Sequence, residues 1–261
     1  MYKFAKKIAK ILFQIFNSKR YLIFDLFYSS RIFLFDKTKY KLSKIRINSP
    51  VDTLTAESIF RHEEYSLDYL KRTKEIYNRY QYYLRNKHQP LVLDCGANIG
   101  LASIFFTHAF PDAKIIAIEP DEINCQFIKI NTEMYKNIEF EHAAIGSVSG
   151  KVEILNPTSH NNEYQTAITS SGAIRLKSIN AILSEHDDFP LFIVKVDIEG
   201  AEENLFEQNN EWIDKCDILM IELHDWLYPG KGTSKNFLKE ISKRDRDLLI
   251  RGENLFSIKK W

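Results

Sequence analysis

The stretch LVLDCGANIG at residues 91–100 decides the fold, because a short apolar run ends there in a glycine turn. Residues 99–109 then continue with a helical pattern. A strand buried on both faces of a sheet reads as such an apolar run, and glycine lets the backbone turn sharply. The free N–H groups at the start of the following helix can approach a ligand closely. The stretch therefore predicts a strand, turn and helix that together form a ligand-binding edge.

Short apolar runs and helical patterns alternate through the rest of the chain. This alternation is typical of a parallel sheet covered by helices on both faces. We therefore expect an α/β fold with a mostly parallel seven-stranded sheet, and a polar loop at residues 157–173. The further strand-like runs are 114–120, 138–145, 151–156, 191–200, 217–224, and a final antiparallel pair at 247–250 and 255–260; the helical patterns are 121–134, 201–208 and 234–243.

The sequence divides the chain into three parts. Residues 1–50 form a basic amphipathic extension, residues 51–90 a helical cap, and residues 91–261 the domain that holds the sheet. Within the extension, residues 1–17 place apolar side chains at helical spacing with lysines between them, and 40–47 resembles a strand. We therefore expect a mainly helical extension.

The cap carries a long helical pattern over residues 55–85. The pattern is broken near Arg72 and Thr73, and it ends before Pro90, whose ring disfavours continuing a helix. We expect this cap to lead directly into the first strand of the sheet.

Charge is distributed unevenly along the chain. The formal net charge is +1, yet residues 1–50 hold 12 Lys/Arg and 2 Asp/Glu, and the remainder holds 24 basic and 33 acidic residues. Two interpretations of the basic part stay open. Residues 1–35 can contact an anionic membrane surface, or they can pack on the acidic domain of the same chain or of a second copy in a homo-oligomer.

Composition describes a globular chain, with 44% hydrophobic and 27% charged residues. The three cysteines, Cys95, Cys125 and Cys216, form no C-x-x-C pair, which favours a reducing compartment. No apolar run reaches the roughly 18 residues that a membrane-spanning helix needs. We therefore expect a cytoplasmic protein, located at the inner membrane face if its N-terminal part binds lipid.

The glycine turn and a downstream acid point to a nucleoside cofactor. Glu119 ends the second strand, 23 residues after Gly96, where a carboxylate can accept both hydroxyls of a ribose. A dinucleotide fingerprint needs G-x-G-x-x-G, but this turn reads G-x-x-x-G after Asp94. A nucleoside that bears methionine needs no pyrophosphate site, and the aspartate suits its ammonium group. The alternative interpretation is a glycine turn that binds nothing.

The sequence resembles the FkbM family of methyltransferases. The resemblance covers roughly residues 91–225, with a weaker stretch at 52–65, and residues 1–50 lie outside it. It implies a Rossmann-like class I methyltransferase fold, S-adenosylmethionine as donor, and a hydroxyl of a glycan or small natural product as acceptor. Where the family commonly has Leu-Asp before the fourth strand, this chain has Ile179-Asn180. The resemblance is carried by DCGANIG (94–100), IEP (118–120), KVDIEGAE (195–202) and IELH (221–224).

The resemblance also implies a cofactor site. The turn would hold the methionine part and the edge of the ribose, Glu119 with Pro120 would take the ribose hydroxyls, and the end of the third strand would border the adenine. The residues implied are Asp94, Gly96, Asn98, Gly100, Glu119, Pro120, His142, Ala143 and Ala144.

Ionisable groups at the ends of the fourth and fifth strands are the catalytic candidates. Methyl transfer to a hydroxyl needs alignment and a base that removes the proton. His224 is our predicted general base, and Lys195 is predicted to pair with Glu222 because a lysine inside a strand needs a partner. Asp197 and Glu199 would orient the acceptor.

Three further inferences concern ligands of this site. Glu199, Glu222 and Tyr164 are candidate acceptor-binding residues. Asp197, Glu199 and His224 together could also hold a divalent cation, but nothing in their spacing demands one, and we expect no metal. Histidines elsewhere have no motif around them.

Other functions stay open. An N-methyltransferase acting on an amine or RNA is disfavoured because Asp-Ile-Glu-Gly at 197–200 replaces the Asn/Asp-Pro-Pro-aromatic motif of such enzymes, so no nucleic-acid partner is expected. A non-catalytic nucleoside-binding protein is disfavoured by the charged strand ends. A dehydrogenase is disfavoured by the missing third glycine.

Overall fold

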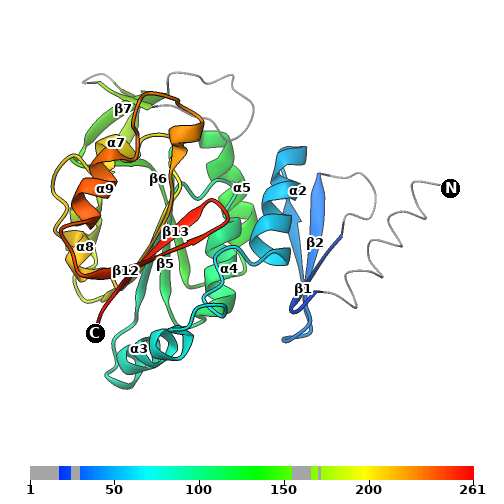
Figure 1. The fold of residues 1–261 in the computed structure, drawn as a ribbon. Helices are drawn as coiled ribbons and strands as arrows, with labels where there is room; N and C mark the ends of the chain where they lie inside the picture. Colours follow the sequence, from blue (N-terminus) through cyan, green and yellow to red (C-terminus); the bar gives the residue numbers. More distant parts are fainter. Residues whose placement is uncertain (1–17, 25–29, 155–165, 170–171) are drawn as a thin grey trace.

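The computed structural model describes residues 18–24, 30–154, 166–169 and 172–261. Its centre is a ten-stranded sheet in the order β12-β13-β11-β10-β4-β5-β6-β9-β7-β8 (Figure 1). The strands are β4 (Leu91–Cys95), β5 (Lys114–Glu119), β6 (Ile138–Gly146), β7 (Gly150–Ile154), β8 (Thr166–Ile168), β9 (Ile174–Ser178), β10 (Leu191–Val196), β11 (Ile218–Glu222), β12 (Arg246–Arg251) and β13 (Asn254–Lys259).

The middle of this sheet is parallel. β11, β10, β4, β5, β6 and β9 pair side by side in one direction, whereas β12 and β13 at one edge and β7 and β8 at the other pair antiparallel. Every residue of β4 and of β10 is buried, which explains why these strands are apolar except for Asp94 and Lys195. The predicted α/β class with a mostly parallel sheet is confirmed.

Helices cover both faces of the sheet, as Figure 1 shows for α4 and α5 on one side and α7, α8 and α9 on the other. On the first side Phe106 and Phe192 are buried, and on the second side Phe206 and Trp212 are buried. The helices are α4 (Leu101–Ala109), α5 (Glu122–Thr132), α6 (Ile179–Glu185), α7 (Glu202–Leu205), α8 (Trp212–Lys215), the short 3-10 helix η2 (His224–Trp226) and α9 (Lys235–Ile241).

The described part of the N-terminal extension is a sheet, not a helix. β1 (Tyr21–Phe24), β2 (Arg31–Asp36) and β3 (Lys41–Arg46) form an antiparallel three-stranded sheet. Burial alternates along β2, so every second side chain faces the core, as in a strand and not as in a helix. The strand predicted at 40–47 is confirmed; the helix predicted at 1–17 lies outside the described residues.

This small sheet packs on the outer side of α4 and α5, beside α2 in Figure 1. The hydroxyl of Tyr21 lies 3.2 Å from Nδ1 of His108 at the end of α4, and the backbone N–H of Arg46 donates to Asn131 on α5 over 2.8 Å. Part of the basic extension is therefore used in packing on the domain of its own chain.

Fewer residues of the cap are helical than the pattern over 55–85 predicted. It contains α2 (Pro50–Ala56), which continues into the π-helix η1 (Glu57–Arg61), and then α3 (Thr73–Arg85). The break predicted near Arg72 and Thr73 is the start of α3. Residues 62–72 between the two helices are turns and bends, and they bring Glu64 and Tyr65 toward the edge of the main sheet.

The sheet has ten strands rather than the expected seven: eight match the strand-like runs of the sequence, and two, β8 and β9, were not predicted. β8 lies inside the segment 157–173 predicted as loop, and β9 pairs with β6 in parallel and with β7 antiparallel. The sequence of β9, IRLKS, alternates apolar and polar residues, which is a strand signal that was missed, and its place in the sheet is set by these long-range pairs. Within the described ranges, none of the helices combines the length and the apolar character needed to span a bilayer.

Candidate functional site

A cavity of about 350 Å³ lies at the carboxyl ends of β4, β5, β6, β10 and β11. Ligands of open α/β sheets bind at this edge, because the turns that follow parallel strands meet there. The opposite wall comes from α2, η1 and the segment after them. The residues that line the cavity are Leu54, Thr55, Ser58, Ile59, Glu64, Tyr65, Gly96, Ala97, Asn98, Ile99, Leu101, Ala102, Ile118, Glu119, Pro120, Asn124, Ala143, Ala144, Ile145, Lys195, Asp197, Ile198, Glu199, Ala201, Glu222 and Glu253.

The glycine turn after β4 packs directly against the end of β10. Gly96 has φ +79°, and a Cβ at this position would lie 1.7 Å from the carbonyl oxygen of Asp197. The backbone N–H of Asp197 in turn donates to the carbonyl of Cys95 over 3.1 Å. Only glycine fits such an approach, so the turn fixes the position of Asp197 as well as its own.

Glu119 is buried at the end of β5, beside this turn. Its carboxylate accepts hydrogen bonds from the backbone N–H of Asn98 at 2.8 Å and of Asp121 at 3.0 Å. Burial raises the pKa of Glu119 to about 7, although these hydrogen bonds favour the charged form. A carboxylate held in this way presents its oxygens at a cavity wall that Ala143 and Ala144 continue.

Three residues predicted to contact the cofactor lie behind the wall instead. Asp94, Gly100 and His142 are not among the lining residues. Asp94 is fully buried and accepts from the hydroxyl of Ser103 at 2.6 Å. The ring of His142 donates to the carbonyl of Pro120 at 2.8 Å, so it supports a lining residue rather than lining the cavity itself.

The predicted pair of Lys195 with Glu222 is wrong. Nζ of Lys195 lies 3.2 Å from Asp94 and 3.3 Å from Asp197, and it donates to the carbonyl of Gly96 at 2.7 Å. The register explains the difference, because Lys195 stands beside Asp94 on β4 and beside Met220, not Glu222, on β11. Burial alone would lower the pKa of Lys195, but Asp94 and Asp197 outweigh it and raise this pKa.

His224 follows β11 and points into a group of carboxylates. Its Nδ1 lies 2.9 Å from Glu202, and its Nε2 lies 3.5 Å from Glu199, 3.6 Å from Glu222 and 3.7 Å from Asp197. Burial lowers the pKa of His224, but Glu202 and the other carboxylates reverse this and raise it to about 9. A protonated imidazole has no lone pair to offer, and His224 does not line the cavity. The predicted base role therefore fits this geometry poorly.

Of the carboxylates around His224, those of Asp197, Glu199 and Glu222 line the cavity, whereas that of Glu202 is fully buried. Burial, reinforced by Asp197, raises the pKa of Glu199 to about 8 and that of Glu222 to about 7. Glu199 also has φ +54°, a conformation that non-glycine residues rarely adopt. We call Asp197, Glu199, Glu222 and His224 the acidic cluster.

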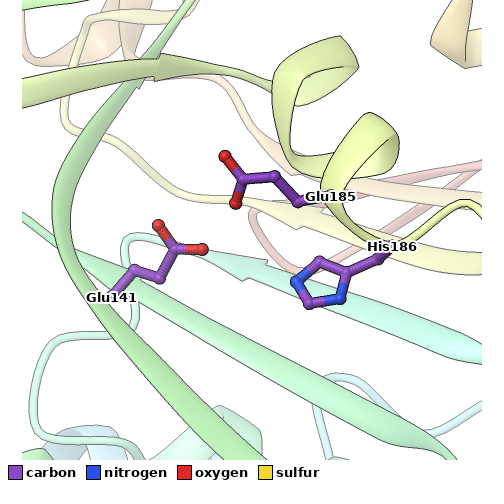
Figure 2. Close-up of side chains that lie close together, drawn as sticks. All are labelled: Glu141, Glu185 and His186. Atoms are coloured by element: carbon purple, nitrogen blue, oxygen red, sulfur yellow. The ribbon is translucent and has the colours of Figure 1, made fainter.

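A second group of similar composition lies elsewhere. Glu141 on β6, Glu185 at the end of α6 and His186 after it lie close together in Figure 2. The ligand atoms of these three residues lie within 4.8 Å of one another, as do those of Asp197, Glu199 and His224. Nζ of Lys177, however, lies 2.7 Å from Glu141 and 2.6 Å from Glu185. We call Glu141, Glu185, His186 and Lys177 the lysine cluster.

Several site residues were not predicted from the sequence. Ser58, Glu64 and Tyr65 line the cavity from the cap, and Glu253 lines it from the turn between β12 and β13. Ser58 and Glu64 fall in the weaker stretch 52–65, and this was the only sequence signal for them. Glu202 is the last residue of KVDIEGAE (195–202), but its contact with His224 depends on how η2 folds back. Tyr164 lies outside the described residues.

Comparisons with known proteins match the part of the chain that forms this edge of the sheet. Residues 94–248 match the model of the methyltransferase FkbM domain. A methyltransferase, sdnD, from Sordaria araneosa is 26% identical, over 49% of this chain and 64% of that protein. The chain therefore spans just under two thirds of the length of that curated relative.

Solved structures are similar at a lower level. An FkbM methyltransferase from Methylobacillus flagellatus is 20% identical, with a TM-score of 0.44 over 65% of this chain and 43% of that one. A methyltransferase from Geobacter sulfurreducens is 13% identical, with a TM-score of 0.37 over 82% of this chain and 92% of that one. The assignment rests on the domain match, which covers more than half of the sequence and includes the glycine turn, Glu119 and the acidic cluster. The chain belongs to the methyltransferase FkbM domain family.

Proposed function

We propose that this protein transfers a methyl group from S-adenosylmethionine to a hydroxyl oxygen of a glycan or small natural product. The observation that carries the proposal is one cavity with two unlike walls. Glu119 and the glycine turn form the first wall, and three carboxylates at the ends of β10 and β11 form the second. A donor and an acceptor can therefore meet within a single cavity of suitable size.

The first wall fits the donor. S-adenosylmethionine supplies an electrophilic methyl carbon on a sulfonium. The carboxylate of Glu119 suits the two ribose hydroxyls, and Ala143 with Ala144 offers a flat apolar surface for a base. Gly96 can carry no side chain, because the carbonyl of Asp197 fills the Cβ position, so the backbone of the turn itself lines the cavity. Asp94 would act indirectly, by holding Lys195 and, through it, the carbonyl of Gly96.

The second wall fits an acceptor that bears hydroxyl groups. Asp197, Glu199 and Glu222 present carboxylate oxygens, which accept hydrogen bonds from hydroxyls and can receive the proton that leaves during attack. The same negative charge would repel phosphate groups, which disfavours RNA. His224 would hold these carboxylates in place rather than act as base.

Calorimetric titration with S-adenosylhomocysteine, the demethylated product, tests the donor site. The variants are Glu119→Gln and, as a matched control, Glu122→Gln, which changes an exposed acid at the start of α5. Losing hydrogen bonds to a charged group should weaken binding by about 10- to 100-fold in Glu119→Gln. An unmodified protein that does not bind, or a control that loses as much, would overturn the proposal.

Transfer of an isotope-labelled methyl group tests the acceptor class. We expect label on sugar and polyol hydroxyls and none on amines of similar size, because a wall of carboxylates would hold an amine as its ammonium form, whose nitrogen has no lone pair to attack the methyl carbon. Label on amines alone would instead favour N-methylation. Membrane contact through residues 1–35, a homo-oligomer and a cytoplasmic location stay predictions.

A further inference from the structure

The acidic cluster gathers three carboxylates around one buried nitrogen. Nε2 of His224 lies 3.5 to 3.7 Å from oxygens of Asp197, Glu199 and Glu222. The side chain of His224 is 1% exposed, whereas those of Asp197 and Glu199 are 25% exposed and line the cavity. The cluster is therefore closed on the histidine side and open on the cavity side.

The orientation of His224 is fixed from behind. Nδ1 of the ring contacts Glu202 at 2.9 Å, and the same carboxylate oxygen accepts from the backbone N–H of Gly200 at 3.2 Å. A cation in front of the ring would take the place of the Nε2 proton. The ring would then keep only its Nδ1 proton, which it donates to Glu202, and would aim the lone pair of Nε2 at that cation. A carboxylate behind the ring and a free nitrogen in front is the arrangement that metal-ligating histidines adopt.

Nε2 of His224 and the carboxylate oxygens in front of it lie at ion-pair distances from one another. Within the described residues, no hydrogen bond reaches Nε2 of His224 or the side-chain oxygens of Glu199 and Glu222. Lys195 lies nearby, but its Nζ contacts Asp94, the carbonyl of Gly96 and Oδ2 of Asp197. Oδ1 of Asp197 faces His224 instead. Carboxylates gathered in this way repel one another unless a cation lies between them.

We infer that Asp197, Glu199 and His224 bind one divalent cation of the Mn²⁺ or Mg²⁺ class, with its remaining positions open to the cavity. Their ligand atoms lie within 4.8 Å of one another, a separation that a central ion can span. Two carboxylates and one imidazole suit such a cation better than a thiolate-seeking metal. Glu222 would stand beside the ion and complete the negative charge around it.

The cation would serve the proposed methyl transfer, and this part of the inference rests on that function. Open positions on the cavity side would bind and align the hydroxyl groups of the acceptor. The attacking oxygen would give its proton to a carboxylate of the cavity wall and form the new bond to the methyl carbon. The bond between carbon and sulfur would break in the same step, which leaves a neutral thioether.

The lysine cluster provides an internal control. Its ligand atoms are equally close, but Nζ of Lys177 already lies within hydrogen-bond distance of both carboxylates. We expect no cation there. Glu185→Gln and His186→Gln are therefore matched controls for Glu199→Gln and His224→Gln, with the same chemical change in a second group of carboxylates around a histidine.

The test is a titration of the full chain, freed of metal, with Mn²⁺ in the absence of acceptor. Calorimetry and the electron paramagnetic resonance signal of free Mn²⁺ report the bound fraction. We expect one saturable site per chain, weakened at least about tenfold in Glu199→Gln and in His224→Gln and changed less than about twofold in the two controls. Mg²⁺ should compete for the site.

The outcomes separate the inference from the proposed function. Absence of a saturable site in the unmodified protein, or equal weakening in the controls, overturns the cation. If His224→Gln fails to fold, Glu199→Gln and the unmodified protein decide the matter, because Glu199 faces the cavity. Titration of the same samples with S-adenosylhomocysteine completes the test. A protein that binds the nucleoside but not Mn²⁺ overturns only the cation. A protein that binds Mn²⁺ but not the nucleoside overturns only the methyl transfer.

Discussion

The acidic cluster and the lysine cluster each gather carboxylates around a histidine, but the carboxylates are neutralised differently. In the lysine cluster, Lys177 reaches Glu141 and Glu185 directly. Burial alone would lower the pKa of Lys177, but the hydrogen bonds with these two carboxylates raise it. The lysine nearest to the acidic cluster, Lys195, is shared between Asp94 and Asp197 and turned toward the glycine turn, which leaves Glu199 without a lysine partner.

This difference separates a structural ion pair from a site that can take a ligand. A carboxylate that already has a cation at hydrogen-bond distance stabilises the fold and offers little to a substrate. A carboxylate without one keeps its oxygens available, as in Glu199, whose pKa is raised by burial and by the charge of Asp197. The composition of a cluster therefore says less about function than the position of the nearest lysine.

The largest expected effect distinguishes the two lysines. Lys195→Met leaves the fully buried Asp94 without its cation and should lower the free energy of unfolding by about 3 to 5 kcal/mol. Lys177→Met should lower it by about 1 kcal/mol, because the side chain of its partner Glu185 is 54% exposed. Urea unfolding followed by circular dichroism measures both. Equal losses would remove the distinction between the clusters.

The next effect concerns two glycines, one beside each cluster. A Cβ at Gly96 would meet the carbonyl of Asp197, and its φ of +79° disfavours other residues, so Gly96→Ala should cost about 2 to 4 kcal/mol. Gly150 pairs with Leu176, next to Lys177, and a Cβ there meets nothing within 4 Å. Gly150→Ala should change the free energy of unfolding by less than about 0.5 kcal/mol.

Unfolding curves of the two alanine variants decide this prediction. Gly96→Ala should also weaken binding of Mn²⁺, because it displaces Asp197. Retention of full stability in Gly96→Ala would mean that the turn does not position the acidic cluster.

Much of the donor side of the cavity could be predicted from the sequence. The glycine turn and Glu119 depend on local features, namely an apolar run, a glycine and the end of the next strand. The partner of Lys195 could not be predicted, because it depends on the register between strands that lie far apart in the chain. Lys195 stands beside Asp94 only once β10 is paired with β4.

The N-terminal sheet was predicted only in part, and β9 was missed. A strand was predicted at 40–47, but the basic and apolar residues of the rest of the extension suggested a helix, whereas the described part pairs as β1, β2 and β3 and buries Tyr21 against α4. β9 carries a local strand signal, because IRLKS alternates apolar and polar residues, but its partners β6 and β7 could not be read from it. The pairing of these strands depends on tertiary structure, which a local pattern does not contain.

Glu119, on the donor side of the cavity, can be compared with the carboxylates of the two clusters. Glu119 has no lysine partner in the described structure, and burial raises its pKa to about 7, with the charge of Asp121 adding to the rise. If the ionised form accepts the ribose hydroxyls, affinity for S-adenosylhomocysteine should be higher above pH 7 and fall below it. Between pH 8 and pH 6 we expect a loss of about tenfold.

Calorimetry at several pH values measures this effect, and Glu119→Gln should show a weaker and flatter profile. A profile that stays steep in Glu119→Gln would assign the pH dependence to another group. The direction also matters, since tighter binding at pH 6 would mean that the protonated acid, not the carboxylate, contacts the nucleoside.

The smallest expected effect tests whether Lys177 alone makes the lysine cluster inert. Lys177→Met removes the cation between Glu141 and Glu185 while their oxygens stay close to His186 (Figure 2). We expect a second, weak site for Mn²⁺ in this variant, with a dissociation constant on the order of 1 mM because Glu185 is largely exposed. Lys177→Arg keeps the positive charge and should gain no site. If Lys177→Met also gains none, exposure rather than the lysine separates the two clusters, and burial of the histidine becomes the feature that makes the acidic cluster a site.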